Sequence, residues 1–336
     1  MTVKHRIEAF SALGEWIRQA LEKGELLPIM GKAQINNPWF TLESQKLALN
    51  GILEFLNTDS LSEWTSSYKI KDQGLWIGIV MAGNIPLVGF HDLLAVLISG
   101  NKAMIKLSSK DNTLTKAIID QLAEIEPQFT DSIQYVENLK GMDAIIATGS
   151  DNSARYFREY FEQFPHIIRK NRVSCAILTG EESEEELNHL SDDIFQYFGM
   201  GCRNVSKLYV PEDFDMGSLD KPFNRYRELL EHNKYANNYF YNRSIYLMNS
   251  QKFRENGFML MKESDELVSP VSVLFYEYYS DLEEVKTELN NSSEKIQCVV
   301  TKDGQLQNGV KFGEAQRPQL SDYADNVDTM EFLINL

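Results

Sequence analysis

Short apolar runs alternate with amphipathic helical segments through most of this 336-residue sequence, and this alternation restricts the possible folds more than any other feature. Each apolar run has the length of a strand, and most are followed by a stretch with apolar residues at three- and four-residue spacing. Strands that alternate with helices predict parallel sheets of the doubly wound α/β type. The expected strands lie at residues 75–81, 102–107, 132–137, 143–148, 173–178, 204–210, 271–277 and 296–301.

Helical periodicity also marks the first part of the chain, before the first expected strand. Residues 5–24 and 43–57 read as two helices, and Asn37-Pro38 breaks the chain between them. Later helices are expected at residues 91–98, 112–125, 150–163 and 281–290, and after Glu184. The pattern therefore predicts a helical entry followed by two doubly wound α/β units.

Length and composition bound the class of protein. A chain of this length with 43% apolar residues can bury a core and is expected to divide into two globular units. Glycine, asparagine and proline interrupt residues 74–88, the longest apolar stretch, which falls short of the roughly 20 residues that span a bilayer. The charged, amphipathic N-terminus lacks the uninterrupted apolar region of a signal peptide. We therefore expect no membrane span and a cytoplasmic location.

Charge and cysteine content exclude further classes. A net charge of −16 opposes binding to nucleic acid, which depends on many lysine and arginine contacts with phosphates. Part of the acidic excess lies in residues 181–186, which are predicted to begin a solvated helix, because the helix dipole favours carboxylates there. The three cysteines lie too far apart for a disulfide framework or a paired-cysteine zinc site, so we expect free thiols and no metal.

The segment Gly78–Leu87 (GIVMAGNIPL) joins an apolar strand to a helix through glycine, asparagine and proline. Alone, such a strand end is most often a turn, in which asparagine tolerates unusual backbone angles. In an open α/β sheet, ligands bind beyond the carboxyl ends of the strands, which is where Asn84 is expected. Asn84 is therefore a candidate for a binding or catalytic role.

Two more strand ends carry groups suited to a nucleotide. Lys106 and Ser108 follow the next expected strand, and the lysine could contact a ribose or phosphate or simply be solvated. Gly149 and Ser150 close a later strand and open a helix, where backbone N–H groups and the helix dipole favour an anion. Ser150 could also serve only as the helix N-cap.

Cys202 differs from the other two cysteines in its sequence neighbours. Cys175 and Cys298 lie among apolar residues in expected strands and are predicted to fill a core. Cys202 lies in a glycine-flanked loop before the strand at 204–210, and glycine lets other groups approach the sulfur closely. We therefore assign nucleophilic chemistry to Cys202: its thiolate attacks a carbonyl, and a nearby amide donor stabilises the oxyanion.

These motifs, in this order, resemble the aldehyde dehydrogenase superfamily, and more closely its acyl-CoA reductase branch, related to the fatty acid reductase of bacterial luminescence. The resemblance extends from about Gly74 to the end of the chain. It implies an α/β fold of two doubly wound domains with a catalytic cleft between them. The implied divisions are residues 1–172, with the N-terminal helices and the NAD(P)-binding domain, residues 173–302, with the nucleophilic cysteine, and residues 303–336, a C-terminal segment for subunit contacts.

Residue roles follow from the same resemblance. AGNIP resembles the loop with the oxyanion-hole asparagine, which gives that role to Asn84, and GMGCRNVSKLYV resembles the nucleophile loop, which gives the acyl-bearing sulfur to Cys202. MIKLS resembles a strand whose lysine and serine contact the adenosine ribose. ATGS resembles the turn that meets the cofactor pyrophosphate, and DELVSP the segment that touches the nicotinamide ribose. The implied cofactor contacts are Lys106, Ser108, Gly149, Ser150 and Glu266.

In one stretch the chain departs from the aldehyde-oxidising members of that superfamily. Those members carry a general-base glutamate in a Glu-Leu-Gly-Gly segment ahead of the nucleophile, whereas residues 166–171 (HIIRKN) of this chain contain no carboxylate. The glutamate activates the water that hydrolyses the thioester, and a reductase does not need that water. The departure therefore favours acyl reduction over aldehyde oxidation. His166 could act as a substitute base or have no catalytic role.

The resemblance thus implies an NAD(P)H-dependent oxidoreductase that takes an acyl group from acyl-CoA or another acyl thioester onto Cys202 and reduces it to an aldehyde. NADPH is the expected cofactor, with NADH as the alternative. A homo-oligomer and an acyl-activating enzyme are the alternatives for a protein partner. Three other functions stay open: an acylating aldehyde dehydrogenase that works oxidatively, a nucleotide-binding subunit without turnover, and a redox protein that uses Cys202 as a sensor. The redox sensor would not account for the asparagine, lysine and glycine-serine motifs together. The joint presence of Asn84 and Cys202 argues against the non-catalytic subunit.

The aromatic stretch Tyr235–Tyr246 has two interpretations. Aromatic residues at such spacing most often fill a core. Ligand pockets are also commonly aromatic, so an acyl channel is the alternative.

Overall fold

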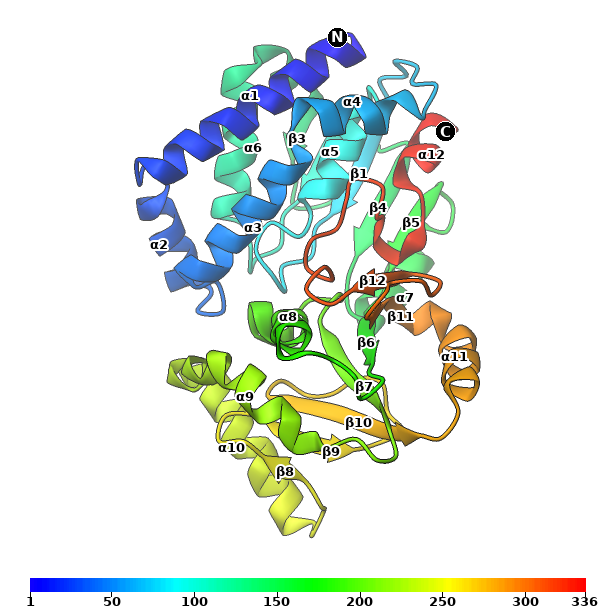
Figure 1. The fold of residues 1–336 in the computed structure, drawn as a ribbon. Coiled ribbons are helices and arrows are strands. Elements are labelled where there is room, and N and C mark those ends of the chain that lie inside the picture. The colour runs from blue at the N-terminus through cyan, green and yellow to red at the C-terminus, as the bar shows by residue number, and fades with distance from the viewer. The chain divides into compact units, whose positions relative to one another are not determined.

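In the computed structural model, which describes all 336 residues, the chain forms two units, each built on one sheet (Figure 1). The first unit consists of Met1–Asn171 and Gln319–Leu336, and the second of Arg172–Pro318. Both sheets consist mainly of parallel strands, which confirms the doubly wound α/β class expected from the sequence. A role of residues 303–336 in subunit contacts stays a prediction.

Five parallel strands form the sheet of the first unit, in the order β3-β2-β1-β4-β5. The chain starts at the central strand β1, adds β2 and β3 on one side, and returns to add β4 and β5 on the other. The connections after β1 and β4 therefore flank the point where the strand order reverses, which is where open α/β sheets bind ligands. The strands are β1 (Trp76–Val80), β2 (Lys102–Lys106), β3 (Ile133–Tyr135), β4 (Ala144–Thr148) and β5 (His166–Arg169).

The helices of the first unit bury one face or, in one case, almost their whole surface. α5 (Phe90–Ile98) is buried along nearly its entire length, as its apolar sequence requires. α6 (Leu114–Ile125) buries Leu114, Ile118 and Leu122, which follow one another at four-residue spacing. The other helices that precede the last strand of this sheet are α1 (Val3–Glu22), α2 (Leu27–Asn36), α3 (Leu42–Phe55), α4 (Thr58–Ser66) and α7 (Asp151–Phe161).

The last residues of the chain complete the core of the first unit. The short helix α12 (Thr329–Ile334), red in Figure 1, buries Met330 and Leu333 completely. A buried ion pair lies beside it, in which Arg169 Nη1 donates to Asp92 Oδ2 (2.5 Å) and Arg169 Nη2 donates to Thr329 Oγ1 (2.9 Å). One guanidinium therefore joins β5, α5 and α12.

Seven strands form the sheet of the second unit, in the order β12-β11-β6-β7-β10-β9-β8, and only β8 is antiparallel to its neighbour. The central strand β7 (Val205–Pro211) pairs with β6 (Val173–Ile177) on one side and β10 (Val273–Tyr279) on the other. Cys202 therefore lies just before the middle of the sheet, at the amino end of β7. The remaining strands are β8 (Arg254–Glu255), β9 (Leu260–Glu263), β11 (Ile296–Thr301) and β12 (Gly309–Lys311).

The acidic run after Gly180 begins a helix, as predicted. α8 (Glu184–Phe195) starts with a capping box, in which Ser183 Oγ accepts from Glu186 N (3.2 Å) and the Glu186 carboxylate accepts from Ser183 N (2.7 Å). The carboxylates of its first turn face the positive end of the helix dipole. The other α-helices of this unit are α9 (Asp220–Phe223), α10 (Asn233–Met248) and α11 (Leu282–Asn291).

Removal of the Arg169 side chain should destabilise the protein. Arg169→Ala leaves Asp92, which is only 7% exposed, as a buried carboxylate without its cation, so the free energy of unfolding should fall by about 3–5 kcal/mol in denaturant titrations. His166→Ala, at the exposed start of the same strand, should change it by less than about 0.5 kcal/mol. A loss in Arg169→Ala as small as that of the control would contradict a structural role for the ion pair.

Candidate functional site

Five predicted site residues lie at one edge of the first sheet. Asn84 lies in the connection after β1, Lys106 ends β2 with Ser108 just beyond it, and Gly149 and Ser150 follow β4. Because the strands are parallel, the carboxyl ends of all three meet at the same edge. The structure therefore brings these residues together where a doubly wound sheet binds ligands.

The connections after β1 and β2 pack tightly against each other through Gly83, the neighbour of Asn84. A Cβ atom at position 83 would lie 2.3 Å from Ser108 Oγ, 2.7 Å from Ser108 Cβ and 3.2 Å from Lys110 Cβ. Only glycine fits at such a distance. The backbone adds a hydrogen bond between the same segments, from Met81 N to Lys106 O (3.1 Å). The loop with Asn84 and the loop with Ser108 thus form one packed structure.

An open pocket of about 400 Å³ lies at the end of β2. Lys106, Ser108 and Glu137 all line it. Lys106 Nζ donates to Glu137 O (2.6 Å), and Ser108 Oγ accepts from Lys110 N (3.2 Å). Pockets for small molecules begin at about 300 Å³ and combine an apolar lining with a few placed polar groups. The pocket is lined by Ile105, Lys106, Leu107, Ser108, Ser109, Asn112, Tyr135, Val136 and Glu137.

Ser150 is the N-cap of α7. Its Oγ accepts from Ser153 N (3.3 Å), which satisfies one of the free N–H groups of the first turn. Gly149 precedes it, and its N–H donates to Arg169 O on the neighbouring strand β5 (3.2 Å). The capping role of Ser150 is thus confirmed, whereas a contact of Gly149 and Ser150 with a cofactor stays a prediction.

In the second unit, Cys202 follows a loop with unusual backbone angles. Tyr197 (φ 53°), Phe198 (φ 60°) and Gly199 (φ 73°) are consecutive residues in the left-handed region. Residues with side chains avoid this region, at a cost of about 1–3 kcal/mol each where they adopt it, and such residues cluster at functional sites. The chain must therefore be held in this conformation by its surroundings.

Hydrogen bonds made by the side chain of Asn204 stabilise this loop conformation. Its buried side chain accepts from Gly201 N (2.7 Å) and donates to Gln196 O (2.9 Å) and Asp193 O (3.0 Å). The Asn204 side chain therefore links the end of α8 to both ends of the loop formed by residues 196–202, which we call the cysteine loop. On the adjacent strand β6, Ser174 Oγ donates to Cys202 O (3.1 Å) and fixes the backbone of the cysteine itself.

The surroundings of the three thiols separate Cys202 from the others. Cys175 and Cys298 are buried in the sheet, and burial raises the pKa of Cys175 to about 12 and that of Cys298 to about 11. Both therefore remain protonated near neutral pH, and a protonated thiol is a poor nucleophile. Cys202 is the partly exposed thiol of the three. The prediction that Cys175 and Cys298 fill a core is confirmed.

Glu266 lies on the exposed connection that leads from β9 back to β10. Two neighbouring residues of β7 hold this connection: Ser206 Oγ donates to Leu267 O (2.5 Å), and Lys207 Nζ donates to Asp265 O (3.1 Å). Lys207 is fully buried and also forms an ion pair with Glu277. The strand that follows Cys202 thus positions the segment with Glu266, whose contact with a cofactor stays a prediction.

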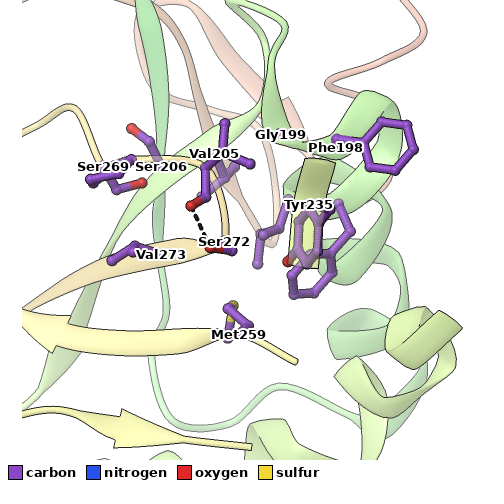
Figure 2. A pocket seen from close by; sticks show the side chains of 13 residues that line it. Phe198, Gly199, Val205, Ser206, Tyr235, Met259, Ser269, Ser272 and Val273 are labelled. Carbon is purple, nitrogen blue, oxygen red and sulfur yellow. Dashed lines mark hydrogen bonds between the residues drawn. The ribbon is translucent and has the colours of Figure 1, made fainter. Parts of the chain in front are cut away.

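A small cavity lies beside the cysteine loop within the second unit (Figure 2). Figure 2 shows Phe198 and Tyr235 on one side of it and Ser269 and Val273 on the other. Its volume of about 30 Å³ is far below the roughly 300 Å³ at which pockets for small molecules begin. Tyr235 Oη, which is buried there, has no hydrogen-bond partner in the protein.

The aromatic stretch Tyr235–Tyr246 is one helix, α10, and mainly fills the core. Tyr239 and Tyr246 pack with apolar residues of β9 and β10, whereas Phe240 and Tyr241 are exposed. The core interpretation therefore accounts for the buried aromatic residues of this stretch.

His166 begins β5 and pairs in register with Ile145 near the start of β4. It therefore lies at the amino ends of the strands, opposite the edge with Asn84, Ser108 and Ser150. Its Nδ1 atom is 2.8 Å from Phe164 O. The structure does not bring His166 to the other predicted residues of the first unit, so it gives no support to a role as substitute base.

Two supporting residues, Asn204 and Ser174, escaped the sequence analysis. An asparagine three residues after a glycine and a serine inside a strand have many ordinary roles, and only the contacts in the folded protein identify the roles of these two residues.

Two other kinds of site are absent from the structure. No group of three or more histidine, cysteine and acidic side chains is arranged to hold a metal ion. None of the helices combines the length and the apolar composition that a membrane-spanning helix needs.

Comparisons with known proteins identify relatives. The family model for acyl-CoA reductase (LuxC) matches residues 48–218, just over half of the chain. The long-chain acyl-protein thioester reductase of Photorhabdus laumondii is 23% identical over 175 residues, which cover 46% of this chain and 36% of that protein. That of Vibrio harveyi is 21% identical over 284 residues, which cover 77% of this chain and 58% of that protein. The chain therefore spans about a third to three-fifths of the length of these relatives.

Solved structures of aldehyde dehydrogenases share the fold. Aldehyde dehydrogenase 21 from Physcomitrella patens, in complex with succinate, matches with a TM-score of 0.63 and 15% identity over 90% of this chain and 73% of that protein. The NAD+ complex of an aldehyde dehydrogenase from Bacillus cereus matches with a TM-score of 0.62, again at 15% identity over 90% of this chain and 73% of that protein. These matches confirm the aldehyde-dehydrogenase-like fold class.

A methyl group at position 83 should disturb the pocket at the end of β2. Gly83→Ala forces the backbone at Ser108 and Lys110 to move, so stability should fall by about 1–3 kcal/mol and binding of a nicotinamide dinucleotide should weaken by about tenfold or more. Unfolding and fluorescence titrations measure the two effects. Gly51→Ala, in α3 with open space around the new Cβ, should instead raise stability by about 0.5–1 kcal/mol. Equal behaviour of the two variants would contradict the proposed contact.

Proposed function

Because the chain belongs to the acyl-CoA reductase (LuxC) family, we propose that it is an NAD(P)H-dependent oxidoreductase that converts an acyl thioester, such as acyl-CoA, to an aldehyde through an acyl-Cys202 intermediate. The observation that carries the proposal is the setting of Cys202. It is a partly exposed thiol on a loop held in left-handed backbone angles, within a family match that extends through residue 218.

The first chemical step assigns the nucleophile to Cys202. Its thiolate attacks the thioester carbonyl, and a tetrahedral intermediate with a negatively charged oxygen forms. Collapse of this intermediate breaks the bond to the carrier sulfur, which leaves as a thiol after it gains a proton, and the acyl group stays on Cys202. Ser174 and Asn204 keep the backbone of the loop in place during the attack.

Asn84 has the role of oxyanion donor in this proposal, together with the backbone N–H of Cys202. An amide donor that is already oriented stabilises the negative oxygen more in the transition state than in the substrate. Gly83 and the loop after β2 keep the Asn84 turn in a fixed conformation. The cofactor, when bound, supplies the hydride that reduces the acyl group and releases the Cys202 thiolate.

The donor groups at the edge of the first sheet fit a nicotinamide dinucleotide. Lys106 and Ser108 offer an ammonium and a hydroxyl in a pocket of about 400 Å³, which suits the adenosine ribose. Gly149 and Ser150 lie at the N-terminus of α7, where the helix dipole favours a pyrophosphate. Glu266 would meet the nicotinamide ribose. We propose NADPH as the preferred form, because Lys106 and the hydroxyls of Ser108 and Ser109 suit the additional phosphate. Glu137 lines the same pocket, and a carboxylate beside that phosphate would favour NADH, which is the alternative.

The carrier of the acyl group and the protein partner belong to the same proposal. The family is named for acyl-CoA, so CoA is one candidate carrier. The relatives in Photorhabdus and Vibrio are named for long-chain acyl-protein thioesters, so a carrier protein and an acyl-activating enzyme are also candidate donors. Self-association is the alternative partnership.

The acyl group should be found on Cys202. Incubation with a radiolabelled acyl-CoA, without reduced cofactor, should give a covalent adduct that hydroxylamine removes, because it is a thioester. Cys202→Ala should give no adduct, whereas Cys175→Ala, which alters a buried thiol, should acylate at the wild-type rate. Persistence of the adduct in Cys202→Ala would contradict the assignment.

The acyl-enzyme should be reduced and not hydrolysed. Residues 166–171 supply no carboxylate to activate water, and a general base typically accelerates such a step by about 100-fold or more. Isolated acyl-enzyme should therefore release free acid at least about 100-fold more slowly than it yields trapped aldehyde after addition of NADPH. Equal rates would mean that another base activates water at the acyl-enzyme, and they would contradict the proposal that the enzyme reduces the acyl group without hydrolysing it.

A further inference from the structure

The turn after Asn84 contains a residue in an unfavourable conformation. Leu87 is buried and has a φ of 59°, in the left-handed region that favours glycine. A branched side chain resists this conformation, so neighbouring groups must hold the turn. The turn ends at α5, since Phe90 N donates to Leu87 O (3.0 Å). The conformation of Leu87 therefore fixes the path of residues 84–90.

Asp111 holds this turn from the neighbouring loop. Its Oδ2 accepts from Leu87 N (2.8 Å) and from Thr115 Oγ1 (2.8 Å). Asp111 is only 5% exposed, and its Oδ1 is buried and has no hydrogen-bond partner in the protein. Burial raises the pKa of Asp111 above its usual range. A buried carboxyl group with an orphaned oxygen is costly, so its position calls for a structural or functional reason.

The same residue also belongs to the loop with the predicted cofactor contact. Asp111 N donates to Ser108 O (3.1 Å), so the carboxyl group is anchored to the segment that forms the pocket at the end of β2. Gly83 packs against that segment on the other side of Asn84. Both ends of the Asn84 turn are therefore attached to the loop Ser108–Asp111. Gly83 packs against this loop at one end, and Leu87 donates a hydrogen bond to it at the other.

We propose that Asp111 is a positioning residue for Asn84. Asp111 accepts the hydrogen bond from Leu87 N and so holds the turn that orients the Asn84 amide. This inference rests on the proposed role of Asn84 as oxyanion donor. It requires an acceptor oxygen at position 111, not a negative charge, because the bond to Leu87 is a backbone amide hydrogen bond.

Turnover of four variants tests the proposal. Asp111→Ala should lower kcat by about tenfold or more, with little change in the KM for acyl-CoA, because a displaced donor costs rate and not substrate affinity. Asp111→Asn, which keeps an acceptor oxygen, should recover most of that loss. In an Asn84→Ala background, Asp111→Ala should cause no further fall in kcat, since the donor that it positions is already absent. Losses that multiply in the double variant would instead indicate a general structural defect and overturn the proposal.

Hydrogen exchange separates this proposal from the proposed function. The Leu87 amide should exchange slowly in the wild-type protein and faster in Asp111→Ala, whereas Asp111→Asn and the wild type should agree. Thr115→Val, which removes only the other hydrogen bond to Oδ2, should leave the exchange of Leu87 close to that of the wild type. If exchange at Leu87 does not respond to Asp111→Ala, the positioning role is wrong. If exchange responds but Asn84→Ala retains full turnover, the fault lies in the role of Asn84.

Discussion

Parallel pairing of β1 with β2 and β4 is the constraint on which the arrangement of the first unit depends. Parallel strands need crossover connections, and each connection leaves at the carboxyl end of its strand. The residues that follow the three strands therefore meet at one edge, although Asn84 and Ser150 lie far apart in sequence. The reversal of strand order between β1 and β4 opens space at this edge, and Gly83 lets two of the loops touch directly. The sheet topology therefore determines where these loops meet, and the close packing at Gly83 keeps two of them in a fixed conformation.

The second unit positions its reactive group in a different way. Three consecutive residues with left-handed backbone angles precede Cys202, and such a loop does not keep its shape by itself. The side chain of Asn204 compensates by binding backbone groups before and after the turn. This arrangement leaves one thiol partly exposed, while the sheet buries the other two among apolar residues and keeps them protonated. Burial therefore separates the two protonated thiols from the partly exposed Cys202.

Strong periodic signals explain which parts of the fold could be predicted from the sequence. The apolar runs at 75–81 and 143–148 became strands, and the acidic run at 181–186 became the start of α8, because local pattern and tertiary burial agree there. The sequence did not predict α10, because aromatic and polar residues occupy all faces of that helix. It did not predict β5 either, because this strand has only four residues and ends in a buried arginine, Arg169. Asn204 and Asp111 could not be identified, since their roles exist only through contacts with backbone groups that the fold brings near. The roles of Asn84 and Glu266 came from family resemblance, and geometry alone would not have assigned them.

The central claim is that the chain reduces acyl thioesters to aldehydes, and the most direct measurement is the stoichiometry of that reaction. The full chain is incubated with NADPH, and in parallel with NADH, and with a series of acyl-CoAs of increasing length, while loss of reduced-nicotinamide absorbance and trapped aldehyde are followed together. The account predicts that aldehyde and oxidised cofactor form in equal amounts for at least one chain length. Absence of aldehyde with every acyl-CoA and every acyl-protein donor, from a protein that binds the cofactor, would contradict it.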